Sequence, residues 1–391
     1  MHVPSRPYPE LVATLMLGVM TVGATVFAFS ALLPDIAAGF DVPVARAAIV
    51  PGVFGLALAL VAPAVGLAAR RLPRANVIAA GLVVYAAAWI MAVAIRRFDV
   101  LLALAVIAGG ATGAVLPATY AYAADLAPPE QRARVMGRIV TGWSLAILAM
   151  VPLMSAVTQF AGWRAAFGLL SACALAIALA LRVVPRPPPG AHEDASGTDG
   201  VAASLVRVLS DRPTLLVLAA NLLDMGAFYA VLAFAAAEMR RVGGLDASLA
   251  GLALAAYGAG LAITSVNAHR VDRWGRRRTG VAALVVLACW LPVLPWLARW
   301  PWAMAAGILA WGVVQGAFFT SITTLATEQI PELRGVVTAL LGGSTYLGVS
   351  LYTLVSAPLY AGMGYWAVGL ASAAGCAVAA ALLGRLPAAR G

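Results

Sequence analysis

Long apolar runs, twelve in number, most constrain what this chain can fold into. A helix needs about 20 apolar residues to cross the hydrocarbon core of a bilayer. Backbone groups in hydrocarbon must be satisfied within the segment, which favours helices, and the runs lack the alternation of barrel strands. We therefore predict an all-α membrane protein with twelve transmembrane helices. The runs lie near residues 11–37, 47–69, 76–95, 100–124, 137–158, 165–183, 214–236, 247–268, 280–297, 303–326, 337–359 and 365–384.

Composition supports this class and excludes several others. The 391 residues are 63% hydrophobic and 11% charged, whereas soluble globular chains carry roughly 25% charged residues. So little polar surface could not coat a soluble enzyme, and it excludes a disordered protein or a disulfide scaffold. Cys173, Cys289 and Cys376 stand apart in apolar runs, without histidines at metal-ligand spacing. The chain has no lysine, and therefore no phosphate-binding GxxxxGK[ST] loop. We expect no cofactor, no metal and no enzyme activity.

The basic residues, all 26 of them arginines, are read as topology signals. They form short clusters between apolar runs, whereas a nucleic-acid-binding domain would carry a basic stripe on a folded surface. Nineteen of them fall at the termini or in the connections on the same side, against seven in the opposite loops. Positive charge favours the cytoplasmic side, so both termini are expected there. The first run is too long for a signal-peptide core and is expected to remain as a span.

One composition break divides the chain into two halves. Residues 185–200 read PRPPPGAHEDASGTDG, a polar and proline-rich stretch that cannot form a core. We expect an N-terminal six-helix bundle over residues 1–184, a cytoplasmic linker over 185–212 and a C-terminal six-helix bundle over 213–391. Residues 201–212 gather apolar side chains on one helical face, which suits a helix on the membrane surface. A plain linker is the alternative.

The two halves are also related by an internal repeat. A gap-free offset of 202 residues aligns loop and glycine positions across both halves, which indicates tandem duplication. Transporters built this way form a site at mid-membrane between halves that move for alternating access. The aligned pairs include Arg71 with Arg273, Arg74 with Arg276, Arg97 with Arg299, Gly110 with Gly312, Glu130 with Glu332, and Gly162 with Gly364.

Four loop motifs give the chain a family resemblance. They read DRWGRR at 272–277, PEQR at 129–132, PELRG at 331–335 and GWRAAF at 162–167. With these motifs the whole chain resembles the major facilitator superfamily, particularly its drug and sugar efflux branch with the arabinose-efflux-like members. The resemblance implies two pseudo-symmetric six-helix bundles and secondary transport. The 272–277 motif corresponds to the family's gating loop, to which Asp272, Arg273, Gly275, Arg276 and Arg277 are assigned; a purely topogenic basic loop is the alternative.

Some positions depart from the family pattern. Arg70 and Pro73 replace the gating Asp and Gly of the N-terminal loop copy, and Ala105 stands where many proton-coupled relatives carry an arginine. Span 5 keeps only Pro152 of the antiporters' glycine-rich motif. These departures weaken a proton-antiport function inherited from the family alone.

Asp224 is the clearest candidate for chemistry inside a span. An ionisable residue there costs about 2.5 to 3.5 kcal/mol on insertion, so its presence suggests a function. Loss of water disfavours the charged carboxylate, which makes proton exchange plausible. Asn221 and Phe228, at i−3 and i+4, are expected to share its face. Hydrogen bonding to a neighbouring helix is the structural alternative. Asp35, near the outer end of the first span, is a second candidate for proton coupling.

In the fold implied by the resemblance, spans 1, 4, 7 and 10 line a central cavity. The polar and aromatic residues on these spans suit a neutral or cationic amphipathic ligand. Threonines can instead bond to their own helix backbone. No arginine lies deep in a span, which argues against a small anionic substrate. The candidate substrate contacts are Thr25, Tyr120, Asn221, Asp224, Phe228, Trp311, Gln315 and Phe318.

The leading hypothesis from the sequence is a secondary active transporter of the bacterial inner membrane. It would export a small amphipathic compound, drug-like or sugar, in exchange for protons through Asp224. An importer or facilitator in which Asp224 binds substrate is the alternative, and a membrane sensor without turnover is a further one. The expected partners are a small-molecule substrate, protons and the lipid bilayer, without nucleic acid, and the expected state is a monomer.

Overall fold

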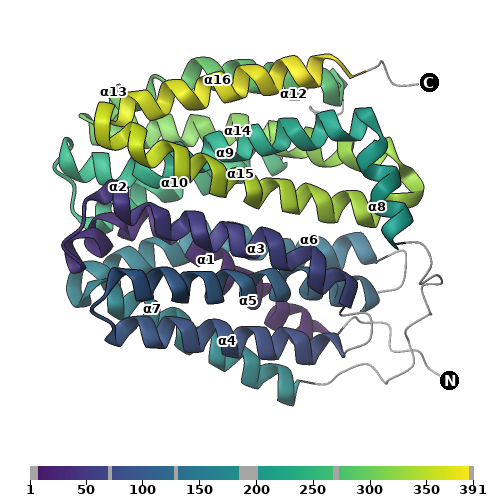
Figure 1. Cartoon of the computed structure of the whole chain (residues 1–391), viewed down its shortest axis with the longest axis horizontal. Coiled ribbons are helices and arrows are strands. Elements are labelled where there is room, and N and C mark those ends of the chain that lie inside the picture. The colour runs from purple at the N-terminus through teal and green to yellow at the C-terminus, as the bar shows by residue number, and fades with distance from the viewer. Residues whose placement is uncertain (1–7, 69–72, 127–130, 185–200, 267–272, 387–391) are drawn as a thin grey trace.

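The computed structural model describes residues 8–68, 73–126, 131–184, 201–266 and 273–386, and every regular element in these ranges is a helix. Figure 1 shows most of them running side by side along one direction. The N-terminal half contains α1 (Pro9–Gly39), α2 (Val44–Ala47), α3 (Ile49–Ala68), α4 (Arg74–Ala94), α5 (Phe98–Asp125), α6 (Arg132–Leu145), the π-helical η2 (Ala146–Met150) and α7 (Val151–Val183). The C-terminal half contains α8 (Val201–Ser210), α9 (Arg212–Arg241), α10 (Ala247–Val266), α12 (Arg276–Trp290), α13 (Leu294–Leu297), α14 (Pro301–Gln329), the 3-10 helix η3 (Pro331–Leu333), α15 (Arg334–Met363) and α16 (Tyr365–Gly384).

The predicted twelve passes are consistent with these helices. Ten described helical stretches are long and apolar enough to cross a bilayer. One of them, Arg134–Val183, holds two passes, because Gly162 interrupts it with φ 82° and ψ 161°. Trp163 next to this break packs on Phe40 at the end of α1, with ring centroids 5.5 Å apart. The remaining pass is α12 with α13, which is too short to count as one helix.

The helices form two bundles that meet along the middle of the molecule. In Figure 1 the purple and blue helices of the N-terminal half lie below the green and yellow helices of the C-terminal half. Contact between the halves runs through α1 with α9, α3 with α15, and α7 with α10. A side chain added at Gly251 of α10 would collide with Ser155 of α7, so small residues permit this close approach.

The two bundles are related by the 202-residue repeat that the sequence predicts. Phe27 of α1 and Tyr229 of α9 are repeat equivalents, and their rings stack with centroids 5.9 Å apart. Ser30 and Leu232 are also equivalent, and the Ser30 hydroxyl donates to the Leu232 carbonyl. Equivalent positions meet only near the axis that relates the two copies, so this pseudo-twofold axis passes between α1 and α9.

Similar ion pairs tie corresponding helices together in each half. Arg74 at the start of α4 pairs with Asp125 at the end of α5, with 2.9 Å between Nη1 and Oδ2. Arg276 at the start of α12 pairs in the same way with Glu328 near the end of α14. Both pairs lie at the end of the molecule at which α1 begins and α16 ends. The opposite end is called the far end below.

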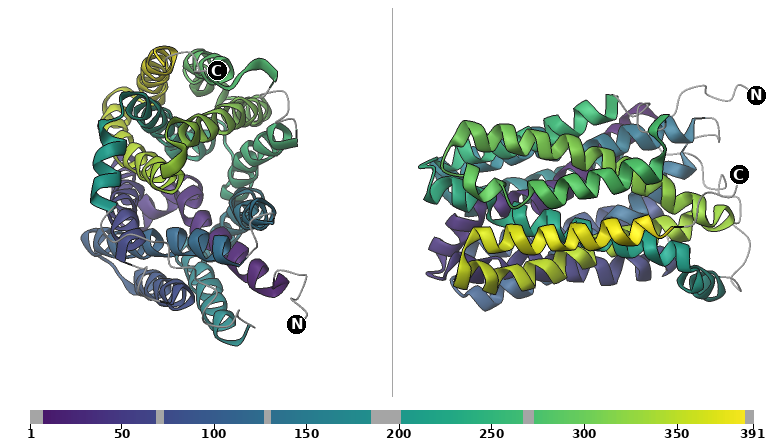
Figure 2. Two further views of the ribbon diagram at one scale, coloured as in Figure 1. Left: turned by 90° about the vertical axis from the view of Figure 1, so that its right-hand side faces the viewer. Right: turned by 90° about the horizontal axis from the view of Figure 1, so that it is seen from above.

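The predicted linker is described only in part. Residues 185–200 lie outside the described residues, and α8 occupies the stretch in which a helix is expected. Figure 2 shows α8 lying across the direction of the other helices. Val208 packs into the core, and Arg207 pairs with Glu332 at 3.7 Å. The orientation suits the expected membrane-surface helix, which stays a prediction.

Candidate functional site

Asp224 lies at the centre of a polar chain inside the C-terminal bundle. Its side chain is 1% exposed, and Gln315 of α14 donates its amide N–H to Oδ2. Trp311, one turn earlier on α14, donates its indole N–H to the Gln315 Oε1 at 3.2 Å. The Cys376 Sγ of α16 lies 4.0 Å from the other carboxylate oxygen. Residues from three helices therefore converge on one buried carboxyl group. The other side chains of this polar chain, those of Gln315, Trp311 and Cys376, are uncharged.

An aromatic cluster covers this polar chain on one side. The ring of Phe228 lies 4.8 Å from that of Tyr257 and 5.1 Å from that of Trp311, between centroids. Tyr257 and Trp311 lie 5.5 Å apart. All three residues are buried, so the cluster keeps water from Asp224. Phe318, further along α14, is also fully buried.

Asn221 faces a different neighbour from Asp224. Its amide nitrogen donates to Ser344 Oγ and Thr345 Oγ1 of α15, both at 2.9 Å. Its Oδ1 is buried without a hydrogen-bond partner. Residues three apart on a helix differ by about 60° in direction, which is enough for Asn221 to reach α15 while Asp224 reaches α14 and α16. The expected shared face is thus divided between two helix contacts.

The candidates in the N-terminal half bond to their own bundle. The hydroxyl groups of Thr25 and Tyr85 share a hydrogen bond, which holds Thr25 against α4. The Tyr120 hydroxyl accepts from the Trp143 indole N–H at 2.7 Å. Neither contact reaches the C-terminal half, and the role of both residues in substrate binding stays a prediction.

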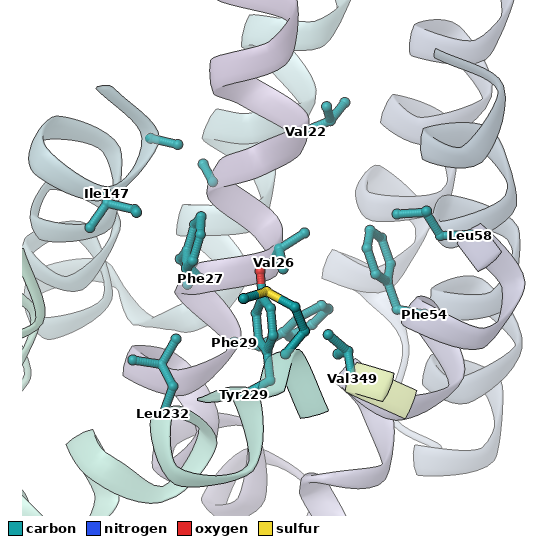
Figure 3. Packing of buried hydrophobic residues seen from close by; sticks show 14 of the residues in the cluster. Val22, Val26, Phe27, Phe29, Phe54, Leu58, Ile147, Tyr229, Leu232 and Val349 are labelled. Carbon is teal, nitrogen blue, oxygen red and sulfur yellow. The ribbon is translucent and has the colours of Figure 1, made fainter. Parts of the chain in front are cut away.

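A small cavity lies between the two halves, beside the pseudo-twofold axis. Its volume of about 20 Å³ is enough for about one water molecule. Figure 3 shows Phe29, Phe54, Tyr229 and Val349 around this region. None of the substrate contacts expected from the sequence lines it. The sequence alone does not show whether an aromatic residue in an apolar run faces lipid or a cavity. Only the repeat, which pairs Phe27 with Tyr229, could have indicated part of this lining. Besides those four, the walls contain Val26, Ser30, Pro51, Gly55, Leu232, Ala233, Tyr346 and Thr353.

Polar contacts between the halves close the far end. Asp35 of α1 accepts two hydrogen bonds from the Arg240 guanidinium of α9, and both side chains are 24% exposed. The Gln159 Oε1 of α7 accepts from the backbone N–H of Ser248 at 3.0 Å. Its amide nitrogen lies 3.4 Å from an Asp246 carboxylate oxygen. These contacts, which we call the far-end latch, join α1 to α9 and α7 to α10.

The predicted gating loop is described from Arg273 onward, and Asp272 lies outside the described residues. Gly275 has φ 85°, a conformation that glycine adopts readily and that a tight turn before α12 requires. Arg276 pairs with Glu328 of α14, and Arg277 donates to the Gly384 carbonyl at the end of α16. Arg273 is exposed. The described part of the loop thus holds α12 to α14 and α16, and its gating role stays a prediction.

Two helical bundles with a closed central cavity and a buried carboxyl group define a membrane transporter fold. The chain belongs to the Major Facilitator Superfamily, whose family model matches residues 15–241 and 216–390. A solved structure with the same fold is a bacterial homologue of the human lysosomal transporter Spinster, in an inward-facing and unoccupied conformation. It has a TM-score of 0.75 at 17% identity, over 97% of both chains.

Curated bacterial relatives cover most of the chain. An uncharacterised MFS-type transporter of Bacillus subtilis, YwfA, is 27% identical over 94% of this chain and 90% of the relative. A chloramphenicol resistance protein of Streptomyces lividans is 29% identical over 83% of this chain and 81% of the relative. A probable sugar efflux transporter of Mannheimia succiniciproducens is 25% identical over 83% and 80%. The resemblance to the efflux branch of the superfamily is therefore confirmed.

Proposed function

We propose that this transporter exports a small amphipathic compound in exchange for protons, and that Asp224 carries the proton. The observation that supports this most strongly is the surroundings of its carboxyl group. No arginine of the described residues lies within ion-pair distance of Asp224, and its hydrogen-bond donor, Gln315, is neutral. An isolated buried carboxylate is costly unless it is paired or takes up a proton.

The polar chain on α14 prepares Asp224 for this exchange. Trp311 holds the Gln315 oxygen, so the Gln315 amide hydrogens remain directed at the carboxyl group. A substrate that competes for Gln315 or disturbs the Phe228 ring would change the surroundings of Asp224. Binding of the compound and release of the proton would then be coupled through direct contacts.

The small volume of the central cavity supports transport by alternating access. About 20 Å³ is far less than the few hundred cubic ångströms of an ordinary ligand pocket, so a substrate needs the halves to separate. The far-end latch and the contact of α1 with α9 are the contacts that must break for opening at that end. We place the protein in the bacterial inner membrane with both termini cytoplasmic, so the far end faces outward.

The substrate we propose is a neutral or cationic amphipathic molecule. The central cavity is lined by aromatic rings together with the hydroxyls of Ser30 and Thr353. Such a lining suits stacking of an apolar body with a few hydrogen bonds. The names of the relatives, chloramphenicol resistance protein and probable sugar efflux transporter, make phenicols and sugars the first compounds to test.

Everted membrane vesicles with an acidified lumen and a fluorescent pH probe test this function. Chloramphenicol, a panel of sugars and a panel of cationic drugs are added to vesicles with the protein, and vesicles without it give the baseline. We expect at least one compound to release protons with the wild-type protein. Asp224→Asn should abolish this release, while Asp99→Asn, at an exposed carboxylate at the far end, should not.

Other outcomes separate the alternatives. Accumulation of labelled solute without proton movement would indicate an importer or facilitator in which Asp224 binds substrate. Ligand binding without any accumulation would indicate a sensor. Proton release that persists in Asp224→Asn would contradict the role of Asp224.

A further inference from the structure

Four exposed tryptophans gather at the far end of the C-terminal half. Trp296 belongs to α13, Trp300 and Trp302 lie at the start of α14, and Trp366 is the second residue of α16. Trp296, Trp300 and Trp302 are 64%, 60% and 87% exposed, and Trp366 is 46% exposed. Figure 1 shows α13 at the far end, beside the beginning of α16. We call these four residues the tryptophan patch.

The helices that carry the patch are packed closely together. The Trp290 indole N–H of α12 donates to the Gly307 carbonyl of α14 at 3.1 Å. A side chain added at Gly307 would collide with Leu297 of α13, and one added at Gly369 of α16 would press on the Pro295 ring of α13. These contacts tie α13 to α14 and α16, so the exposed indole rings project from a well-defined backbone.

The patch lies where the hydrocarbon core gives way to the lipid headgroups. The helix α14 has 29 residues and is therefore about 44 Å long, whereas the hydrocarbon core is about 30 Å thick. A helix of that length, centred on the core, extends roughly 7 Å beyond it at each end. Trp302, the second residue of α14, is thus placed among the headgroups. Indole rings favour this layer because they combine an apolar body with an N–H donor.

The charge around the patch is positive. Arg299, in the turn between α13 and α14, is exposed and forms no ion pair within the part of the chain that the structure describes. Residues 273–327 contain no acid. The neighbouring turn, residues 238–246, packs closely on the Ala298 carbonyl at Gly243; its two arginines and two acids add no net charge. A guanidinium without a carboxylate partner suits a phosphate group, which it can bind through two parallel hydrogen bonds.

The N-terminal half lacks this arrangement at the equivalent positions of the repeat. An alanine, a phenylalanine and a valine stand where the patch has Trp296, Trp300 and Trp302. The phenylalanine, Phe98, is buried. Arg97, the equivalent of Arg299, pairs with Asp99, with 3.9 Å between Nη2 and Oδ2. A feature that the fold alone required would be expected in both halves. The patch and its unpaired arginine therefore indicate a role specific to the C-terminal half.

We propose that the tryptophan patch and Arg299 bind an anionic phospholipid in the leaflet at the far end. The Arg299 guanidinium pairs with the lipid phosphate, and the indole rings pack beside the glycerol region. A zwitterionic lipid fits less well, because its cationic headgroup finds no carboxylate in residues 273–327. This binding site is separate from the central cavity and does not depend on the proposed exchange of protons.

Photolabelling of the protein in phosphatidylcholine vesicles tests this site. Two trace probes carry the same diazirine at an early acyl carbon, one on phosphatidylglycerol and the other on phosphatidylcholine. We expect the phosphatidylglycerol probe to label residues 294–302 about fivefold more than the other probe, the effect of one basic side chain near an anionic lipid. Arg299→Gln should remove this preference. Arg97→Gln is the matched control, because Arg97 is the exposed repeat equivalent beside Asp99, and it should leave the preference unchanged.

Both arginine substitutions fall on exposed side chains, so the fold should be retained. Trp302→Ala should lower labelling by both probes, because an indole ring contributes packing and no charge. Any of four results would overturn the proposal: equal labelling by the two probes, a phosphatidylglycerol preference that survives Arg299→Gln, the same preference at residues 94–100, or labelling unchanged by Trp302→Ala. Competition by soluble glycerol phosphate as strong as that by unlabelled phosphatidylglycerol would also overturn it, because the site would then bind a free anion instead of a lipid.

Discussion

At the scale of single residues, two aspartates within spans differ in the side chains that they contact. Asp35 faces the Arg240 guanidinium across the boundary between the halves, while Asp224 faces the neutral amide of Gln315 within one half. The ion pair ties Asp35 to the other bundle. These different surroundings support the proposed division of roles, with Asp35 in the far-end latch and Asp224 in proton exchange.

A charge swap distinguishes these roles for Asp35. Asp35→Asn should reduce transport several-fold, because it leaves the partly buried Arg240 without its partner. The double variant Asp35→Arg with Arg240→Asp should restore most of the rate, since the pair is re-formed in reverse. Transport rates in vesicles at equal protein amounts measure this. Failure of the swapped pair to recover, with normal folding by gel filtration, would contradict the latch and favour Asp35 as a proton carrier.

At the scale of helices, the turns between passes depend on glycines with positive φ. Gly162 and Gly364 are repeat equivalents with φ of 82° and 87°, and no other atom lies near enough to Gly162 to hinder a side chain there. The requirement at Gly162 is therefore conformational and independent of packing.

Gly162→Ala should accordingly destabilise the protein by about 1–3 kcal/mol, the cost of placing an L-residue at a positive φ with an extended ψ, a region that is populated almost only by glycine. Gly342→Ala is the control, because Gly342 lies within α15 in open space; there the better helix propensity of alanine should stabilise by up to about 1 kcal/mol. Thermal unfolding of both variants in detergent, followed by circular dichroism, checks the opposite signs. Equal midpoints would show that the turn at Gly162 lacks the strained geometry.

The sequence predicts the helices better than it predicts the site. Apolar runs and the 202-residue offset locate the spans, because both depend on composition along the chain. The site depends on the direction of each side chain around its helix, which a sequence without regular amphipathic patterns does not specify. Asn221 and Asp224 therefore turn to different helices, and Thr25 turns toward Tyr85. The sequence identifies Asp224 and Gln315 as candidates because polar residues in spans are rare. It does not predict the hydrogen bond between them.

At the scale of the whole molecule, contacts at the far end hold the two halves together. The α7–α10 contact is held by Gln159, which bonds to the Ser248 backbone and lies near Asp246. If transport requires this contact to open, a covalent link across it must stop the cycle.

Cross-linking tests this requirement in a variant without native cysteines. A short thiol cross-linker across Gln159→Cys and Ser248→Cys should reduce transport about tenfold or more, and a reducing agent should restore it. The control pair is Arg46→Cys with Asp99→Cys, at two residues of the N-terminal half whose side chains form an ion pair with 3.9 Å between Nη2 and Oδ1. Full activity of the cross-linked Gln159 and Ser248 pair would show that the halves need not separate there.

The central claim is that Asp224 carries the proton that drives export. The most direct measurement compares two modes of transport in proteoliposomes, using whichever compound releases protons in vesicles. We predict that Asp224→Asn still exchanges labelled for unlabelled compound across the membrane, because the isosteric amide can keep a hydrogen bond to Gln315. It should fail to accumulate the compound when a pH gradient is imposed. Accumulation by Asp224→Asn at the wild-type level would contradict the claim.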